Sequence, residues 1–486
     1  MRRFTIFLTF LLILAACAPL ATPTQPAQPT SAPVKPTTAL TEVAPEPEAS
    51  NPAVKASLEN SLLATEWQGK SKEHLLYPLD PATGLALSGY TPISLGFLSY
   101  HAFSPDRQTL AVVSFPNDYA YDGSLLLIDL PTWKTQRFEL ELRGWVSNMI
   151  FSPDGTRLAI AHGDLKPTIT MVDIAKGAIT AQGNTDASFA SRLKFTANGE
   201  GLMLYGPAIQ NRFTENEMSA GPPWVFLLDA ADLSTLWSVE LNGVRDGIFP
   251  NDENVTPSNI HEPGQAFYLS PGLAFAPDQD ILYVVHADSE QLTTVDFESQ
   301  TVETVEIQTK LTWFERLLSL TAGVAQAKIG DGTTKQAVVS PDGQFVYVVG
   351  VDNATYQDKQ KNWQMEQTPL GLEIIQTSDG SRVEHFESDA TELSLSPDGR
   401  FLYLRNWGSH LDNIPSTEIF DLSNQQLVAR KTGISAIPAL LMNGEFLLVS
   451  TYSTAEHSHH MSILEPDASK VLSEWKGTEF VWFLTP

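Results

Sequence analysis

The most regular pattern of the chain is an apolar run, a short polar turn and a second apolar run. Its clearest copy is V-S-P-D-G-Q-F-V-Y-V-V-G at residues 339–350. The flanking residues are β-branched or aromatic, as is typical of strands buried between neighbours. Pro341 pre-sets the turn, Asp342 can accept a hydrogen bond from the chain, and Gly343 tolerates the positive φ that closes it. The pattern predicts a strand–turn–strand unit in which Asp342 is structural rather than catalytic.

Weaker copies of this unit recur along the chain, each followed by a third apolar strand and a more polar fourth strand. The residues at the second turn position are Pro105, Pro153, Ala197, Pro277, Pro341, Pro397 and Met442. Four strands per unit, repeated at intervals of about 45 residues or more, are typical of a β-propeller. One further interval of 44 residues, as between Pro153 and Ala197, ends at Pro486, the last residue.

The two ends of the repeat region complement each other. Phe480–Pro486, F-V-W-F-L-T-P, has the pattern of a first strand without a second, and Ser61–Trp67 that of a second strand without a first. Pairing them would remove the exposed edges of an open array. We therefore expect an all-β protein, a β-propeller of eight four-stranded blades closed by pairing of its N- and C-terminal strands. Seven blades is the alternative, if one degenerate copy is not a blade.

The repeated turn, followed by hydrophobic residues and Tyr or Leu before Val, resembles the WD40-like and YVTN-type repeats of bacterial β-propellers. The resemblance covers Leu58–Pro486, and Tyr347–Gly350, Y-V-V-G, is the stretch nearest to the Y-V-T-N tetrapeptide. It implies the propeller fold. It does not imply a function, because this fold has binding, scaffolding and enzymatic roles.

The N-terminus has the pattern of an export signal. Arg2 and Arg3 precede an apolar stretch, Phe4–Leu14, and the sequence L-A-A-C follows, ending at Cys17. This motif resembles the bacterial lipobox, in which the cysteine is lipidated. Cys17 is the only cysteine of the chain, so no intramolecular disulfide can form. We predict a lipoprotein signal peptide over residues 1–16, a lipid anchor on Cys17, and a place in the cell envelope on the extracytoplasmic side of a bacterial membrane.

Residues 17–57 are dominated by Pro, Thr and Ala and are expected to form an extended tether, because they cannot bury enough apolar surface to fold. The propeller domain then spans residues 58–486. The chain has a formal net charge of -27. An acidic surface repels phosphate backbones, so nucleic acid is not an expected partner.

Long insertions interrupt the repeats near residues 206–223, 242–270, 308–335 and 350–369. The resemblance implies that connections from second to third strands, and those between blades, lie on one face. Elaborated loops on a rigid scaffold are where function concentrates. We predict that this face binds a protein or small-molecule partner.

Histidines follow several second strands and are expected on the same face. They are His162, His286, His410, His457, His459 and His460. If the imidazoles converge they could ligate zinc or copper, and carboxylates of the same loops could hold calcium. The alternative is a set of solvated loop histidines, and no other cofactor is predicted.

Residues 309–328 have a helical rather than a strand period. The apolar face of this predicted helix includes Trp313, Phe314, Leu317 and Leu318. It could dock a partner or a membrane surface, or it could pack over the propeller.

These observations leave three classes of function open. The first is a cell-surface lipoprotein whose propeller binds a ligand or protein through its loop-rich face. The second is an extracytoplasmic metal-dependent enzyme, a hydrolase or oxidoreductase, with its site at the propeller mouth. The third is a structural envelope protein without a ligand.

Overall fold

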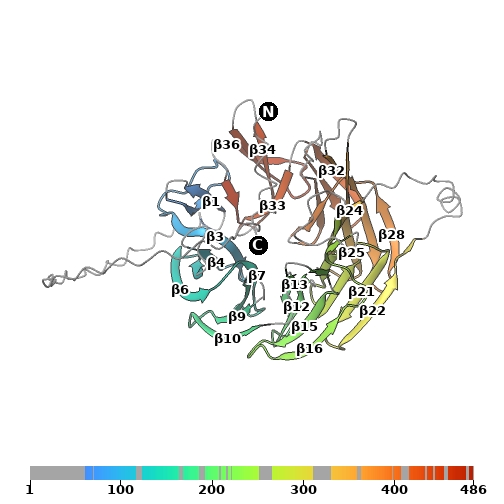
Figure 1. Ribbon diagram of the computed structural model, residues 1–486. Helices are drawn as coiled ribbons and strands as arrows, with labels where there is room; N and C mark the ends of the chain where they lie inside the picture. The colour runs from blue at the N-terminus through green and yellow to red at the C-terminus, as the bar shows by residue number, and fades with distance from the viewer. Residues whose placement is uncertain are drawn as a thin grey trace, which may run out of the picture. The chain divides into compact units, whose positions relative to one another are not determined.

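The computed structural model describes the strand region of the chain with short gaps, and every element it describes is a strand (Figure 1). The described residues are 58, 61–68, 71–115, 123–163, 168–184, 192–206, 209–214, 217–220, 222–250, 265–309, 330–357, 363–396, 398–406, 415–432, 435–441, 444–453, 458–477 and 481–484. Cys17, Trp313, Phe314, Leu317, Leu318, His410 and His457 lie outside them, and so does most of the predicted helix.

Consecutive strands pair antiparallel in sheets of mostly four strands. The N-terminal strands are β1 (Leu62–Gln68), β2 (Glu73–Leu79), β3 (Ile93–Phe103), β4 (Thr109–Phe115), β5 (Gly123–Asp129) and β6 (Lys134–Leu142). The next sheet contains β7 (Val146–Phe151), β8 (Arg157–His162), β9 (Thr168–Asp173) and β10 (Ala178–Asn184). It is followed by β11 (Arg192–Phe195), β12 (Gly201–Gly206), β15 (Trp224–Asp229) and β16 (Thr235–Glu240).

The C-terminal half repeats the same order. Its first two sheets contain β19 (Gly272–Phe275), β20 (Ile281–Val285), β21 (Gln291–Asp296) and β22 (Thr301–Glu306), and then β24 (Gly330–Val339), β25 (Phe345–Gln357), β27 (Leu372–Gln376) and β28 (Ser381–Phe386). The third sheet contains β29 (Glu392–Leu395), β30 (Phe401–Asn406), β31 (Ser416–Asp421) and β32 (Gln426–Thr432). The last sheet contains β33 (Ser435–Leu441), β34 (Gly444–Ser453), β35 (Ser458–Leu464) and β36 (Val471–Gly477). A short strand, β23 (Gln308–Thr309), pairs parallel with β28. The predicted strand–turn–strand units are confirmed in these residues.

Strand β3 belongs to two sheets because it bends at Gly96, whose φ is 66°. Ile93 and Ser94 pair with β2, and the stretch Phe97–Phe103 pairs with β4. At the other end of the chain, β37 (Val481–Phe483) pairs antiparallel with β1. The order β37-β1-β2-β3 therefore joins one C-terminal strand to three N-terminal strands, as expected from the sequence.

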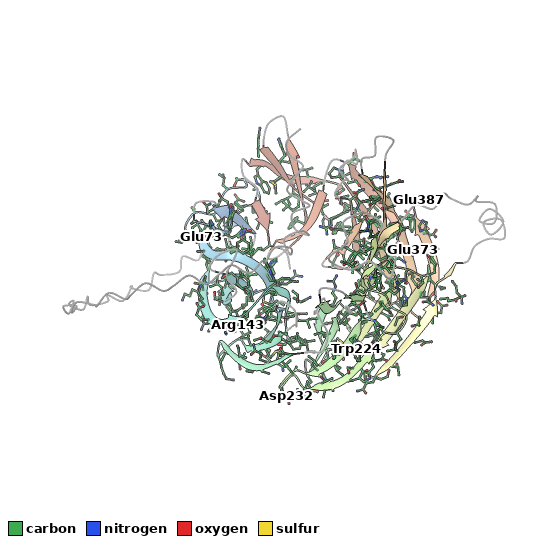
Figure 2. All side chains as sticks on the ribbon, in the orientation of Figure 1. Glu73, Arg143, Trp224, Asp232, Glu373 and Glu387 are labelled. Atoms are coloured by element: carbon green, nitrogen blue, oxygen red, sulfur yellow. The ribbon has the colours of Figure 1, made fainter. Side chains whose placement is uncertain are left out.

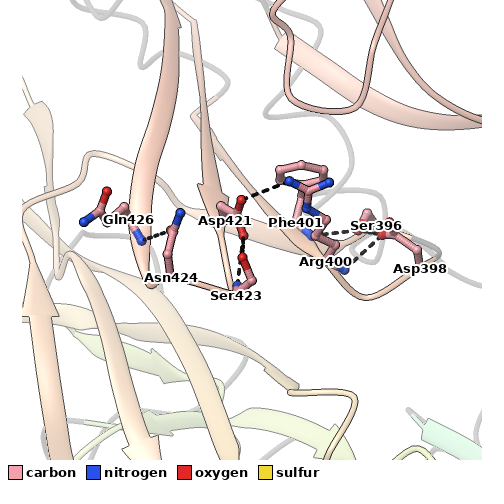
Figure 3. A network of polar contacts seen from close by, with 8 residues as sticks. All are labelled: Ser396, Asp398, Arg400, Phe401, Asp421, Ser423, Asn424 and Gln426. Carbon is pink, nitrogen blue, oxygen red and sulfur yellow. Dashed lines mark hydrogen bonds and ion pairs between the residues drawn. The ribbon is translucent and has the colours of Figure 1, made fainter.

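The recurring turn is held by its own side chains (Figure 3). The Ser396 hydroxyl donates to Asp398 Oδ1 at 2.5 Å and accepts the Phe401 N–H at 2.8 Å. Asp398 Oδ1 also accepts the Arg400 N–H at 2.9 Å. In an equivalent turn the Ser152 hydroxyl is the main cause that lowers the pKa of Asp154 to about 2. The turn carboxylates are therefore committed to the backbone.

A second set of polar contacts, made by an aspartate, closes the turn after the third strand. Asp421, the last residue of β31, accepts the N–H of Ser423 at 2.9 Å and its hydroxyl at 2.6 Å (Figure 3). Asp129, Asp173, Asp229 and Asp296 accept backbone N–H groups in the same place. The acidic residue that ends these strands is explained by turn capping.

The core is formed where neighbouring sheets pack face to face. Leu158, Ile160 and Val172 of one sheet pack against Val113 and other residues of the preceding sheet. Corresponding apolar clusters lie between each later pair of neighbours. The last sheet, β33–β36, packs against β1 and β2 through Met461, Ile463 and Leu62.

Candidate functional site

The insertions add short strands outside the repeating sheets. They form two hairpins, one of β13 (Ile209–Thr214) with β14 (Glu217–Ala220) and one of β17 (Gly247–Pro250) with β18 (Ala266–Leu269). They also lengthen β25, which pairs with the added strand β26 (Trp363–Pro369). Sequence patterns did not reveal these strands.

The added strands lie next to one another. Strand β14 contacts β17, and β18 contacts β24. Ser270 connects the last two, since its N–H donates to the Thr333 carbonyl at 3.0 Å and its carbonyl accepts the Lys335 N–H at 2.8 Å. The described parts of four insertions, which are far apart in sequence, thus form one region, which we call the hairpin wall. It contains residues 209–214, 217–220, 245–250, 266–270, 330–335, 351–357 and 363–369.

A cavity of about 400 Å³ opens in the hairpin wall. It is lined by Phe267, Leu269, Asp288, Gly332, Thr333, Asp352, Asn353, Ala354 and Thr368. Its walls combine an apolar side from β18 with carboxylate, amide and hydroxyl groups from β24, β25 and β26. Such a mixture is typical of sites for small ligands or single side chains.

An arginine and two aromatic rings stiffen the apolar side. Phe249 and Phe267 stack with their centroids 5.6 Å apart. The Arg245 guanidinium lies over both rings, 4.2 Å from the first centroid and 5.1 Å from the second. It also lies 3.7 Å from a carboxylate oxygen of Asp288. The cationic group thus links the hairpin to the cavity wall.

Glycine is required where β18 crosses β24. Gly332 has a φ of 119°, and a Cβ atom there would lie 1.8 Å from the Tyr268 carbonyl oxygen. Any side chain would push the two strands apart. On the same strand, Thr333 donates its hydroxyl to Asp352 Oδ1 at 2.6 Å, which orients that carboxylate at the cavity.

A charged network anchors β24 and β28 behind this region. Arg382 pairs with Glu373 at 2.8 Å and also contacts Glu290; Glu373 is labelled in Figure 2. Burial lowers the pKa of Lys335, and the Glu373 carboxylate is the largest influence in the opposite direction. The charged groups of β27 and β28 therefore act on Lys335 of β24, one of the strands that line the cavity.

A buried tyrosine–aspartate pair lies beside the β17–β18 hairpin. The Tyr205 hydroxyl donates to Asp246 Oδ2 at 3.0 Å, and both side chains are buried. Burial raises the pKa of Asp246 to about 6, although the bond from Tyr205 acts in the opposite direction. The sequence carried no sign of this pair, because Asp246 lies in an insertion without periodicity.

Two of the histidines considered as metal ligands are used inside the sheets. His162 Nδ1 donates to the Arg143 carbonyl and Nε2 accepts from the Thr170 hydroxyl, both at 2.8 Å. His286 likewise bonds Thr293 at 2.7 Å and Ser289 at 3.3 Å. Burial lowers the pKa of both rings. In this arrangement neither ring has a nitrogen left for a metal.

Two more of the histidines considered as metal ligands are described, His459 and His460, which pair with Tyr452 and Thr451 across β34 and β35. Across the described ranges, no group of three or more His, Cys, Asp or Glu side chains is placed to hold a metal ion. In the same part of the chain, no helix is long and apolar enough to cross a membrane.

No known protein family matches the sequence, and no curated protein is significantly similar to it. Among solved structures, this chain is similar to dihydro-heme d1 dehydrogenase NirN in complex with DHE, with 11% identity over 87% of this chain and 75% of that chain and a TM-score of 0.51. It also matches a eukaryotic initiation factor, with 11% identity over 87% of this chain and 98% of that chain and a TM-score of 0.43. Hydrazine synthase of Kuenenia stuttgartiensis matches with 14% identity, 79% and 99% coverage and a TM-score of 0.40.

At such identities a structural match concerns the fold alone. NirN is a β-propeller protein, and the described part of this chain consists of successive antiparallel sheets. The chain is therefore all-β, with a fold of the β-propeller type.

Proposed function

We propose that this protein is a lipid-anchored binding protein of the cell envelope, and that the hairpin wall holds its ligand. The observation that carries the proposal is that four separate insertions meet and that three of them line one cavity. Extra strands with no role in the repeating sheets are expected where a rigid scaffold carries a binding site.

The lining of the cavity indicates the ligand chemistry. Phe267 and Leu269 offer an apolar surface, while Asp352 and Asn353 offer oxygen atoms. The chain has a net charge of -27, which raises the local concentration of cations and disfavours anions. The ligand is therefore expected to combine an apolar body with a cationic or hydrogen-bond-donating group.

The architecture is proposed to be a closed propeller of eight blades. In this proposal β37, β1, β2 and the start of β3 form one blade. Each of the other seven blades has an S-P-D-G-like turn between its first and second strands. The pairing of β37 with β1 and the packing of β33–β36 on β1 and β2 support it. A closed ring would give the hairpin wall a stiff support.

Cross-linking from the cavity tests the binding role. A photoreactive amino acid at the exposed cavity residue Thr368 is expected to capture a partner or ligand in intact cells. The same group at the exposed turn residue Gln344 is the control and should capture nothing. Asp352→Asn should reduce capture at position 368 by about tenfold, since it removes the cavity carboxylate. Equal labelling at both positions, or none at 368, would contradict the binding role and favour a structural envelope protein.

The anchor is tested by replacing the cysteine. Cys17→Ser removes the acceptor of the lipid, so the protein should move from the membrane fraction to the soluble fraction. Metabolic labelling with a radioactive fatty acid should label the native chain and not the variant. If the variant stays in the membrane pellet, or if the native chain takes up no label, the lipoprotein assignment is wrong.

The metal-dependent enzyme is not the reading that we favour. It depended on converging imidazoles, and the two that the structure describes in detail, His162 and His286, are bound within their own sheets.

A further inference from the structure

A second cavity lies between the sheets β3–β6 and β7–β10. Its volume is about 780 Å³, and its lining comes from the end of β6, the ends of β8 and β9, and β10. The lining residues are Glu139, Leu140, Arg143, His162, Thr168, Gly177, Ala178, Ile179, Gln182, Gly183 and Asn184. It is separate from the hairpin wall, and its lining is more polar than apolar.

The face of sheet β7–β10 that borders this cavity changes from apolar to polar along the strands. Cross-strand pairing sets three residues in each row. The rows are Leu158, Val172 and Ile179; then Ile160, Thr170 and Gln182; then His162, Thr168 and Asn184. Leu158 and Val172 of the first row pack in the apolar core while Ile179 is exposed, and the third row carries only polar groups. The two sheets thus meet through apolar contacts at one end and leave a polar groove at the other.

Hydrogen bonds hold these polar groups in place. Gln182 Nε2 donates to Thr170 Oγ1 at 3.0 Å, and that hydroxyl donates to His162 Nε2 at 2.8 Å. The Thr168 hydroxyl donates to Asn184 Oδ1 at 2.9 Å. Burial lowers the pKa of His162, which agrees with a neutral ring that accepts the Thr170 hydrogen bond. The side-chain amides of Gln182 and Asn184 are therefore oriented before any ligand arrives, and both residues line the groove.

Two charged groups line the groove, and an exposed tryptophan follows them in the sequence. Glu139 and Arg143, both exposed, line it with formal charges that cancel; Arg143 is labelled in Figure 2. Trp145 is two residues further along and is 56% exposed, with its carbonyl held by the Gly163 N–H at 3.0 Å. An exposed indole ring and planar polar groups suit a ligand with apolar C–H faces and many hydroxyls.

We propose that this groove binds a neutral carbohydrate chain. Vicinal hydroxyls donate to and accept from the amides of Gln182 and Asn184 and the charged groups of Glu139 and Arg143, while Trp145 stacks on a sugar face. The net charge of -27 disfavours sugars that carry phosphate, sulfate or carboxylate groups. The site is independent of the hairpin wall, so either can be correct without the other.

The corresponding place in another sheet provides a matched control. In the sheet β19–β22, hydrogen bonds connect His286 to Thr293 and Thr293 to Thr304, and the two threonine Oγ1 atoms are 2.8 Å apart. Thr304 therefore occupies the position that Gln182 has in β7–β10. A threonine hydroxyl is too short to replace the outward-facing amide of Gln182.

The test is a calorimetric titration of the full-length protein in detergent with neutral trisaccharides: maltotriose, cellotriose, mannotriose and chitotriose. Saturable binding of at least one is expected, with Arg143→Ala and Gln182→Ala each weakening it by about tenfold and Thr304→Ala leaving it unchanged. The Arg143 side chain makes none of the hydrogen bonds among Gln182, Thr170 and His162. A loss of affinity in Arg143→Ala therefore reports on ligand recognition and not on a defect of folding. No saturable binding of any trisaccharide, or equal affinity of the native, Arg143→Ala and Gln182→Ala proteins, would overturn the proposal.

Discussion

A chain that ends at Phe480 is expected to lose several kcal/mol of stability, because the deletion removes β37 from the edge of β1. In the native protein Ala64, Thr65 and Glu66 pair with Phe483, Trp482 and Val481. The Leu484 N–H donates to the Leu63 carbonyl at 3.1 Å. Without β37 the backbone groups of β1 become an unpaired sheet edge, which also favours aggregation.

A single substitution in the same place isolates the packing contribution. Leu484 is 5% exposed and lies in a cluster with Leu63, Leu76 and Leu95. Leu484→Ala is expected to cost about 2–4 kcal/mol, the usual range for a buried leucine. Urea unfolding followed by circular dichroism measures both variants.

The control for this substitution is Leu472→Ala on β36, where the side chain is 39% exposed. It should change the free energy of unfolding by less than about 0.5 kcal/mol. Coincident unfolding curves for the native and truncated chains would show that β37 contributes nothing, and a closed ring of eight blades would then lose its main support.

The repeating strands and the terminal pairing were predictable because the signals that specify them are local. Ser340 and Asp342 bond to residues within five positions of themselves, so their motif can be read without knowing the rest of the fold. Even a degenerate copy keeps the geometry, since Arg107 adopts a φ of 57° where other copies have glycine.

The hairpin wall was not predictable in the same way. Its cavity forms between Phe267, Asp288 and Asp352, which come from different parts of the chain, and no local pattern encodes their meeting. The face on which the insertions would lie could be anticipated only from the resemblance to known propellers. The strands themselves were hidden because their residues lack a clear alternation of apolar and polar positions.

For the histidines, the sequence predicted the position along the strand but not the hydrogen-bond partner of each ring. The sequence placed His162 and His286 correctly at the ends of second strands. It could not show that each ring lies opposite a threonine of the next strand, where a short hydrogen bond is available within the sheet. Strand position is local information, whereas the neighbour of a side chain depends on register and twist.

Asp246→Asn is expected to stabilise the protein at neutral pH and to change how its stability depends on pH. The folded pKa of Asp246 is raised from 3.8 to about 6 by burial. A raised pKa means that the contribution of this group is fully present below pH 3.8 and is lost as the pH rises through 6. The shift corresponds to about 3 kcal/mol at neutral pH. The amide keeps an oxygen that can accept the Tyr205 hydroxyl.

The measurement is the difference in unfolding free energy between the variant and the native protein from pH 3.5 to 8. It should rise as the pH increases from about 3.8 to about 6, the unfolded and folded pKa values, and level off above this range. His162 and His286, whose pKa values are lowered, change stability in the opposite direction, but they are common to both proteins and cancel in the difference. Tyr205→Phe removes a bond that lowers the pKa of Asp246, so it should move the pH dependence to higher pH. A difference that does not vary with pH would mean that Asp246 is hydrated in solution, and that the β17–β18 hairpin opens far enough to admit water to the Tyr205–Asp246 pair.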